Sequence, residues 1–404
     1  MKMIKRVALQ EVSEASTEFP ALLVTGARQV GKTTLLRDAA EAGRRFVSLD
    51  MLTIRDLARR DPRAFLRTYS PPVTIDEIQY APQLLPYIKM MIDESPDAVG
   101  QFWLSGSQQF QMMKDVSESL AGRVAVINLG GISQGEELGR TADGAFCVDS
   151  DISPDEEFEG VEDLFARIHR GAFPALVSGK VRNWARFYGS YVSTYVERDI
   201  RDIAKVSNEE RFLKFVRAAA ARTGQLLNVS ELARDVGISV PAAKDWLGIL
   251  KASNLVYFLQ PYSRNITSRI VKTPKLYFTD TGLCCFLLGW DTPKTLMNGA
   301  MAGAMFETFV VAEILKRSWN VGRDPRLYFY RDRLGVEIDL LLERNGILGP
   351  VEIKKNTNPS VMDIKAFDKV NAAGISLGNG AVVCPAEKAM PLTDSVKVIP
   401  AGAI

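Results

Sequence analysis

The chain has 404 residues, of which 47% are hydrophobic and 24% are charged, and its formal net charge is +2. These values describe an ordinary globular protein of two or three domains. They exclude a strongly basic nucleic-acid-binding coat. The apolar residues are spread along the chain, and no stretch reaches the roughly 18 to 20 consecutive apolar residues that a membrane span needs. One histidine excludes most histidine-based catalysis, and four cysteines without a CxxC pair argue against a structural zinc site and a disulfide framework. The N-terminus lacks the apolar core of a signal peptide, so we expect a cytoplasmic protein.

The first 150 residues alternate between predicted strands and helices. Strands are expected at residues 21–25, 45–49, 72–75 and 101–104, and helices at residues 32–40 and 84–93. Apolar strands separated by helices predict a parallel sheet that is buried on both faces, with helices covering each face. The acidic residues 149–163 then predict a linker or insertion exposed to solvent.

A phosphate-binding motif follows the first predicted strand. Residues 26–33 read GARQVGKT and fit the P-loop pattern G-x-x-x-x-G-K-[ST] between a strand and a helix. Backbone N–H groups and the helix N-terminus would hold the phosphates of ATP. Lys32 would reach the β- and γ-phosphates, and the Thr33 hydroxyl would bind Mg²⁺. The expected nucleotide-binding residues of this motif are Gly26, Arg28, Gln29, Val30, Gly31, Lys32, Thr33 and Thr34.

A second motif adds two carboxylates at the end of a strand. Residues 73–77 read VTIDE, which is a Walker B arrangement. Asp76 is expected to bind Mg²⁺ together with Thr33, and Glu77 to orient and polarise the attacking water. Arg123 precedes another apolar strand and is a candidate arginine finger, acting in cis or on a neighbouring subunit. The alternative for Arg123 is a surface residue in a local ion pair.

These motifs, in this order, resemble the AAA-type ATPases of bacteria and archaea whose C-terminal half is a domain of unknown function related to PD-(D/E)XK nucleases. The resemblance rests on GARQVGKTTLL, TIDEIQYAPQLLPYIK, LSGSQQF and SLAGRV. It continues through GAFPAL, YVERDI, LYFTDTGL, GAMFETFVVAEI and EIDLLLERNG to VEIKK. It implies that Ser107 or Gln108, at the end of a strand, contacts the γ-phosphate or the water; otherwise both are polar turn residues. The acidic residues 149–163 depart from the family pattern and leave the first domain boundary open.

The middle of the chain predicts a winged helix-turn-helix. A helix over residues 209–222 precedes a short helix at 230–236, and Ser239 caps a further helix that has Pro241 in its first turn. Its buried face would carry Val240, Ala243, Leu247 and Leu250, and its free face would present Lys244 and Lys251 to DNA phosphates. The basic residues from position 240 to 275 are Lys244, Lys251, Arg264, Arg269, Lys272 and Lys275. The alternative is a lid or a surface that binds a protein partner.

The C-terminal part carries a second candidate site. Alternation along residues 335–343 places Glu337, Asp339, Leu341 and Glu343 on one face, and Asn345-Gly346 predicts a hairpin turn. The returning strand places Glu352 and Lys354 together, so Asp339, Glu352 and Lys354 are expected to converge with the helical Glu307. With the family resemblance, this set predicts a PD-(D/E)XK nuclease-like site that binds Mg²⁺ or Mn²⁺ through Asp339 and Glu352. The alternatives are a solvated charged face or an inert binding module.

Together these observations predict three α/β and helical units. They are an AAA-type P-loop core (residues 1–165), a helical lid with a winged helix (166–274) and a restriction-endonuclease-like α/β domain (275–404). We expect an ATP- and Mg²⁺-dependent ATPase that forms a homo-oligomer, binds no membrane, and couples nucleotide state to a DNA-binding C-terminal domain, with DNA cleavage by that domain left open. The alternative is an ATP-dependent switch that binds a protein partner or DNA while the nuclease-like domain is inert. A small-molecule kinase is disfavoured because no acceptor pocket is evident.

Overall fold

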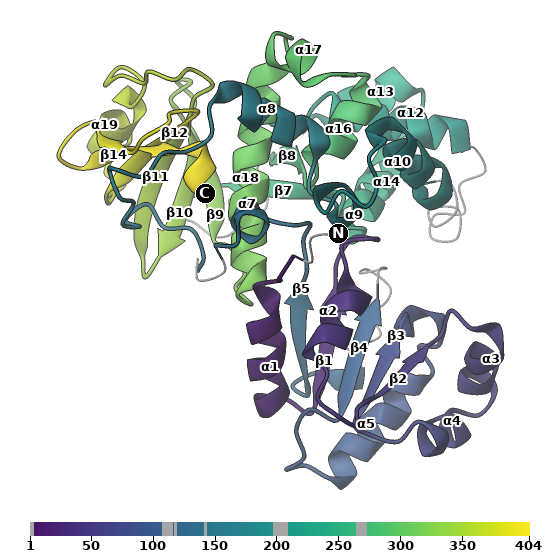
Figure 1. Ribbon diagram of the computed structural model, residues 1–404. Helices are drawn as coiled ribbons and strands as arrows, with labels where there is room; N and C mark the ends of the chain where they lie inside the picture. The colour runs from purple at the N-terminus through teal and green to yellow at the C-terminus, as the bar shows by residue number, and fades with distance from the viewer. Residues whose placement is uncertain (1–3, 107–115, 117–118, 141–143, 197–208, 264–272) are drawn as a thin grey trace.

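The computed structural model describes residues 4–106, 116, 119–140, 144–196, 209–263 and 273–404. Figure 1 shows an N-terminal domain that is joined to a larger body, which holds the middle and C-terminal parts of the chain. None of the helices in these ranges combines the length and the apolar character needed to cross a membrane. All four cysteines are free thiols, as the sequence predicts.

The N-terminal domain is a parallel sheet in the order β2-β3-β4-β1-β5. Its strands are β1 (Ala21–Thr25), β2 (Arg45–Ser48), β3 (Val73–Asp76), β4 (Phe102–Gly106) and β5 (Val124–Asn128). Its helices are α1 (Ala8–Glu18), α2 (Lys32–Ala39), α3 (Leu52–Arg60), α4 (Pro62–Thr68) and α5 (Leu84–Glu94), with the 3-10 turn η1 (Ile78–Tyr80) after β3. The predicted parallel sheet is confirmed.

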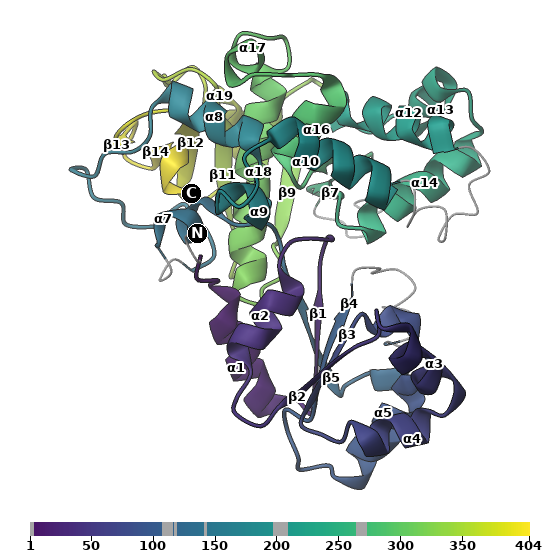
Figure 2. The ribbon, with the colours of Figure 1, turned by 45° about the vertical axis from the view of Figure 1, so that its right-hand side comes forward.

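Alternate residues of β1 show how helices cover both faces of this sheet. Leu22 and Val24 pack in one apolar cluster with residues of α1 and α2, whereas Leu23 packs in another with residues of α4 and α5. Such two-sided burial explains why the predicted strands are continuous apolar runs rather than alternating ones. The carboxyl ends of the parallel strands meet at one edge, and the P-loop follows β1 there (Figure 2).

The acidic segment, residues 149–163, lies against the C-terminal part of the molecule. After α7 (Gln134–Leu138), the Phe158 N–H donates to the Glu387 carbonyl at 2.9 Å, and Lys397 donates to the Ser150 carbonyl at 2.6 Å. The segment is therefore attached to the molecule rather than a free linker. The next helix, α8 (Val161–Arg170), spans the predicted boundary at residue 165, so that boundary falls within a helix.

The middle part has the order helix, strand, helix, helix, strand, strand. These elements are α12 (Glu209–Ala220), β6 (Gln225–Leu226), α13 (Val229–Val236), α14 (Val240–Ala252), β7 (Val256–Pro261) and β8 (Lys275–Phe278). Ser239 caps α14 by accepting the Ala242 N–H, as predicted. Val240 differs from the prediction because it is 36% exposed; Trp246 instead packs edge-on against Phe212 and Phe215.

The rest of the middle part consists of helices. They are α8, α9 (Pro174–Val177), α10 (Trp184–Tyr191), α16 (Thr281–Leu288) and α17 (Pro293–Met297), and the π-helical turn η2 (Val192–Val196) follows α10. His169 lies in α8, where its ring stacks on Trp184 and its Nε2 lies 2.8 Å from the Trp290 carbonyl oxygen. Burial lowers the pKa of His169. The one histidine of the chain thus has a packing role.

One mixed sheet joins the middle and C-terminal parts, in the order β13-β14-β12-β11-β10-β9-β7-β8-β6 within the described residues. Its further strands are β9 (Leu327–Arg331), β10 (Glu337–Arg344), β11 (Ile347–Ile353), β12 (Gly380–Cys384), β13 (Met390–Pro391) and β14 (Val396–Pro400). The remaining helices are α18 (Ala302–Asn320), α19 (Lys365–Ala372) and the 3-10 turn η3 (Ala401–Ala403). The predicted boundary at 274/275 separates β7 from β8, which pair antiparallel, so residues 275–278 belong with the middle part.

The long helix α18 connects the two halves of the molecule. Figures 1 and 2 show α18 running from the C-terminal sheet toward α1 and β5 of the N-terminal domain. It is buried along most of its length and includes the buried ionic side chains Glu313 and Lys316.

Candidate functional site

The P-loop adopts the backbone conformation that its two glycines permit. Gly26 has φ +150°, and a Cβ atom there would lie 2.2 Å from the Leu129 carbonyl oxygen, so the loop and the end of β5 approach too closely for any side chain. Gly31 has φ +97° and forms the N-cap of α2. Such left-handed conformations cost glycine little, which explains why the motif needs glycine at both positions.

Lys32 lies folded against the loop that it follows. Its Nζ donates to the carbonyls of Gly26 at 3.0 Å and Ala27 at 2.9 Å, and the side chain is buried. Burial lowers its pKa to about 8, although the carboxylates of Glu77 and Asp76 oppose this shift. A buried ammonium that bonds to neutral carbonyl oxygens is suited to exchange them for charged phosphate oxygens.

Asp76 at the end of β3 is held by two hydroxyl groups. Thr33 Oγ1 lies 3.2 Å and 3.1 Å from its two carboxylate oxygens, and Ser105 on β4 donates to Oδ1. Both Asp76 and Ser105 are buried. The sequence prediction missed Ser105; the available signal was one hydroxyl residue at the end of an otherwise apolar strand. Thr33 and Asp76 together supply hard oxygen ligands, the set that Mg²⁺ prefers.

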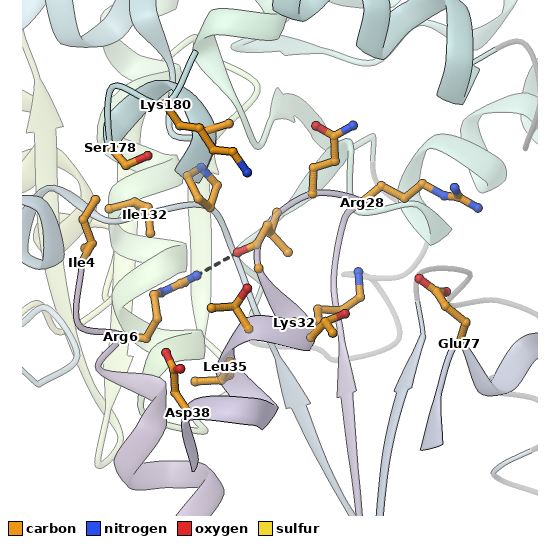
Figure 3. Close-up of a pocket in the computed structure, with 17 residues that line it drawn as sticks. Ile4, Arg6, Arg28, Lys32, Leu35, Asp38, Glu77, Ile132, Ser178 and Lys180 are labelled. Carbon is orange, nitrogen blue, oxygen red and sulfur yellow. Dashed lines mark hydrogen bonds between the residues drawn. The ribbon is translucent and has the colours of Figure 1, made fainter. Parts of the chain in front are cut away.

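Glu77 follows Asp76 in a left-handed backbone conformation, with φ 58° and ψ 48°. This conformation is uncommon for a residue other than glycine and occurs often at functional sites, where the surrounding structure maintains it. The Glu77 carboxylate accepts a hydrogen bond from Gln79 Nε2. The turn thereby directs Glu77 away from the sheet and toward the P-loop side (Figure 3).

A cavity of about 490 Å³ lies beside these residues. It is lined by the P-loop, by Glu77 and by side chains from two other parts of the chain (Figure 3). The lining residues that the sequence did not predict are Ile4, Arg6, Leu35, Asp38, Ile132, Pro174, Ala175, Ser178 and Lys180. Residues 174–180 come from the middle part, so a molecule in this cavity would contact both the N-terminal domain and the middle part.

Of the other predicted site residues in the N-terminal domain, some line the cavity and others lie outside the described residues. Arg28, Gln29, Val30, Gly31 and Thr34 line the cavity, whereas Ser107 and Gln108 lie outside the described residues.

Arg123 lies at the opposite edge of the sheet from the P-loop. Its carbonyl accepts the N–H of Ala21, the first residue of β1, and its guanidinium pairs with Asp93 at 2.6 Å. Because β1 has five residues, roughly 16 Å of strand separates Arg123 from the loop. An action of Arg123 in cis is therefore excluded.

A buried ion pair fixes the conformation of the P-loop. Arg6 Nε bonds to Glu136 Oε1 at 2.9 Å, while the same guanidinium donates to the carbonyls of Val30 at 2.9 Å and Gly130 at 3.0 Å. Glu136 is 3% exposed and also completes a capping box with Ser133 at the start of α7. Arg6 thus joins the N-terminal segment, the P-loop and α7 at one point.

Replacing Arg6 by Ala should lower the free energy of unfolding by about 3–5 kcal/mol, because the Glu136 carboxylate would remain buried without its partner. Urea unfolding at neutral pH measures this change. The matched control is Arg123→Ala, which removes a half-exposed ion pair and should cost about 0–1 kcal/mol. Equal destabilisation by the two substitutions would contradict a structural role for the Arg6–Glu136 pair.

In the C-terminal part, Asp339, Glu352 and Lys354 lie together where the start of β10 adjoins the end of β11. Lys354 Nζ lies 2.7 Å from Glu352 Oε2 and 3.9 Å from Asp339 Oδ2, and Asp339 accepts the Ile353 N–H at 2.9 Å. Glu352 is 4% exposed, and its Oε1 has no hydrogen-bond partner among the described residues. Burial and the neighbouring Asp339 raise the pKa of Glu352 to about 8, while Lys354 opposes that rise.

Glu307 on α18 does not join that cluster directly. Its Oε1 accepts from Lys275 Nζ at 3.2 Å and from the Tyr277 hydroxyl, and Lys275 also binds Glu337 at 2.7 Å. Burial raises the pKa of Glu307, Lys275 opposes the rise and Asp339 adds to it. In the described ranges, the His, Cys, Asp and Glu residues form no group of three or more that could hold a metal ion. The predicted convergence of four residues on one cation is therefore replaced by two lysine-bound clusters.

A β-bulge in β10 causes a second departure from the predicted alternation. The pairing of β10 with β9 shifts register between Ile338 and Leu341, and both residues pack in the same apolar cluster. A bulge inserts one extra residue, which reverses the alternation beyond it. Leu341, predicted on the acidic face, is fully buried as a result.

The predicted DNA-contacting residues are only partly placed. Lys244 and Lys251 are exposed on α14, and Lys251 lies 6.0 Å from the centre of the Phe258 ring. Lys275 is buried in its ion pairs and cannot belong to a surface patch. Arg264, Arg269 and Lys272 lie outside the described residues. Two of the six basic residues are thus shown at the surface.

Comparison with known proteins agrees with the N-terminal geometry. Residues 18–138 match the model of the AAA domain. Residues 161–294 match a domain of unknown function, DUF8612, and residues 302–404 match another, DUF4143. The N-terminal domain therefore matches the AAA domain over residues 18–138 and carries a P-loop sequence within that match. The other two matches show neither a winged helix nor a nuclease-like fold.

Two curated relatives cover the whole chain. They are the uncharacterized proteins Mb2031c of Mycobacterium bovis and Rv2008c of Mycobacterium tuberculosis. Each is 29% identical over 405 residues, an alignment that spans 100% of this chain and 85% of the relative.

The solved structures that match this chain resemble it only weakly. A point variant of Thermotoga maritima RuvB is 14% identical, with 62% of this chain and 86% of that chain covered and a TM-score of 0.30. A DNA replication initiation factor is also 14% identical, with 61% of this chain and 87% of that chain covered and a TM-score of 0.28. Scores this low carry no structural conclusion.

Proposed function

We propose that this chain binds ATP with Mg²⁺ at its P-loop and hydrolyses it to ADP and phosphate. The observation that supports this proposal is the placement of Lys32, Thr33 and Glu77 around one cavity of about 490 Å³, with the Asp76 carboxylate bonded to the Thr33 hydroxyl. This reaction needs a cation that binds the phosphates, oxygen atoms that bind a metal ion and a carboxylate that orients the attacking water. The match of residues 18–138 to the AAA domain agrees with it.

Each of these residues has a defined role in the proposed reaction. Lys32 leaves the carbonyls of Gly26 and Ala27 and binds the β- and γ-phosphates. Thr33 and Asp76 would hold Mg²⁺, which would neutralise part of the charge on the phosphates. Glu77, positioned by Gln79, orients the attacking water and accepts a hydrogen bond from it.

The direct experiment is the release of phosphate from ATP, measured with Mg²⁺ and after chelation, over a range of protein concentrations. We expect turnover that stops when Mg²⁺ is removed. Arg123 can assist only a neighbouring copy, so a homo-oligomer that uses it would show specific activity that rises with protein concentration. Absence of turnover under all these conditions would contradict the proposal.

In this proposal, buried polar contacts couple the nucleotide bound at the P-loop to the C-terminal part of the molecule. Arg6 binds the Val30 carbonyl of the P-loop and Glu136 of α7. In the same helix, the Gln134 N–H donates to Glu313 of α18 at 2.9 Å, and Glu313 pairs with Lys316 at 2.5 Å. Helix α18 also carries Glu307, so these contacts and the helices α7 and α18 connect the P-loop to the Glu307–Lys275 ion pair.

The finer part of the proposal concerns DNA. The element order from α12 to β8 is that of a winged helix, and Lys244 and Lys251 would contact phosphates. Asp339 and Glu352 with Lys354 resemble a nuclease centre. The buried Glu352 Oε1 without a hydrogen-bond partner fits a divalent cation there, since the described contacts leave this oxygen unsatisfied. If the centre is inert, the chain remains an ATP-dependent switch that binds DNA or a protein.

Replacing Asp339 by Ala should reduce Mn²⁺ binding to the C-terminal cluster at least tenfold and abolish any Mn²⁺-dependent degradation of plasmid DNA. The matched control is Glu343→Ala, at the far end of the same strand. Calorimetry with Mn²⁺ in the absence of nucleotide measures this loss, because the parent and the two variants share the same P-loop. Equal Mn²⁺ binding by Asp339→Ala and the parent would contradict the site, and cation binding without DNA degradation would favour the switch.

A further inference from the structure

A basic segment of the N-terminal domain takes no part in the proposed reaction. Residues 44–68 include β2, α3 and α4 and hold seven arginines, three aspartates and no other charged residue, which gives a net charge of +4. The whole chain, by comparison, has a formal net charge of only +2. Figures 1 and 2 show α3 and α4 at an outer edge of the N-terminal domain. Positive charge is therefore concentrated at this edge rather than spread over the molecule.

Most of these arginines have no acidic partner. Among the described residues, the ion pairs of this segment are Arg44 with Glu41 and Arg55 with Asp50. The other five arginines are exposed, lie in no ion pair there and form what we call the arginine surface: Arg45, Arg59, Arg60, Arg63 and Arg67. Two of them each donate one hydrogen bond to a backbone carbonyl at 2.7 Å. Their positive charge thus faces the solvent.

Helix stability does not explain Arg63. Helix α4 begins at Pro62, and Asp61 caps it by accepting the Ala64 N–H at 2.8 Å. Arg63 therefore lies in the first turn, whereas the helix dipole favours cations in the last turn. Arg67 follows one turn later on the same face, a spacing at which like charges repel. A surface that binds an external anion accounts for both positions.

The chemistry and the spacing of these side chains suit phosphate groups. A guanidinium presents a planar set of N–H donors that can bond to two phosphate oxygens at once, and the segment contains arginine but no lysine. Arg63 and Arg67 are about 6 Å apart along α4, and Arg60 ends α3 directly before the Asp61 cap. Phosphates follow one another every ~3.4 Å along each strand of a DNA duplex, so neighbouring arginines can contact different phosphates.

The apolar side chains of α3 and α4 favour DNA over a membrane as the partner. Most of them pack in the apolar cluster between these helices and the sheet: Ile54, Leu57, Phe65 and Leu66. A helix that binds a membrane surface places its apolar side chains in the lipid instead. The exposed apolar residues Met51 and Leu52 lie at the start of α3, whereas Arg60 lies at its end.

We propose that the arginine surface binds the phosphate backbone of double-stranded DNA without regard to base sequence. This inference goes beyond the proposed function, because it places a DNA contact on the N-terminal domain itself. The contacts proposed above lie elsewhere, at Lys244 and Lys251 of α14 and at the C-terminal carboxylates. None of the five arginines lines the nucleotide cavity, so the inference does not require ATP hydrolysis.

The test measures binding of a fluorescent DNA duplex of mixed sequence to the full chain by anisotropy, over a range of salt concentrations. A variant with Arg60→Gln, Arg63→Gln and Arg67→Gln should bind at least about tenfold more weakly at low salt. The slope of log K against log[salt] should fall in magnitude by about 3, because each lost phosphate contact removes ~0.9. Arg63→Gln alone should lower it by about 1.

The matched control removes three exposed arginines of other surfaces, with Arg182→Gln, Arg186→Gln and Arg323→Gln. It should keep the parent's DNA affinity and salt slope, and both triple variants should hydrolyse ATP without DNA at the parent's rate. A second background, Lys244→Ala with Lys251→Ala, should lose the same further slope when the arginine surface is removed, since distant sites act independently.

The inference is wrong if the parent does not bind duplex DNA, or if the arginine variant and the control show equal salt slopes. It is also wrong if the arginine variant binds DNA like the parent but no longer binds vesicles of anionic lipid, because the surface would then belong to a membrane contact. A parent that does not hydrolyse ATP would overturn the proposed function and would leave the DNA measurement intact.

Discussion

Replacing Glu77 by Gln should leave ATP bound and slow phosphate release by about 100- to 1,000-fold. The amide keeps nearly the shape of the carboxylate but cannot accept a proton or polarise water to the same degree. Lys32, Thr33 and Asp76 remain in place, so the contacts to phosphate and Mg²⁺ persist. Phosphate release under single-turnover conditions, together with equilibrium binding of a fluorescent ATP analogue, measures the two quantities separately.

The matched control for this substitution is Glu94→Gln, at the exposed C-terminal end of α5. It should change neither ATP affinity nor the rate of hydrolysis. A Glu77→Gln protein that turns over ATP at the parent's rate would show that another group activates the water.

Replacing Lys32 by Ala should weaken ATP binding by at least about 100-fold and remove turnover. The buried ammonium is the cation closest to the place where the P-loop would hold the β- and γ-phosphates, and a charge-assisted hydrogen bond to phosphate in a partly dry site contributes strongly. Calorimetric titration with ATP and Mg²⁺ measures the loss. Lys214→Ala, on the exposed face of α12, is the control. ATP affinity within tenfold of the parent would exclude Lys32 as the main phosphate ligand.

The lowered pKa of Lys32 gives this site a pH dependence. Lys32 is protonated in the free protein below about pH 8, so ATP affinity should be constant there and should fall as the pH rises above that value. The stability of the nucleotide-free protein changes in the opposite sense. Between about pH 8 and the ordinary lysine value of 10.5, the unfolded chain binds more protons, so Lys32 makes the free energy of unfolding rise with pH.

The sequence predicted those parts of the site that depend on local pattern. The P-loop and the Walker B strand each lie within one short segment, and their glycine, lysine and carboxylate residues need only adjacent strand and helix contexts to be placed. The parallel sheet with helices on both faces follows from the same apolar runs. Ser239 as the cap of α14 is also a local feature, since the hydroxyl bonds within its own first turn.

The residues that the sequence missed depend on contacts between distant segments. Arg6 and Glu136 are 130 positions apart, and no spacing rule relates them. Ser105 becomes a partner of Asp76 only because β4 and β3 are neighbours in the sheet. Lys275 was predicted in a basic surface patch, but the fold buries it against Glu307 and Glu337. The bulge in β10 likewise depends on its pairing with β9 rather than on alternation within the strand.

The most direct test of ATP binding at the P-loop is a crystal structure of the full chain with Mg²⁺ and an ATP analogue whose β–γ bridging oxygen is replaced by an imido group. The predicted result has the β- and γ-phosphates on the P-loop N–H groups, with Mg²⁺ bound by Thr33 and Asp76. Lys32 Nζ would have moved from the Gly26 and Ala27 carbonyls to phosphate oxygens. A structure at saturating analogue in which Lys32 still bonds to both carbonyls and the phosphates lie elsewhere would contradict it.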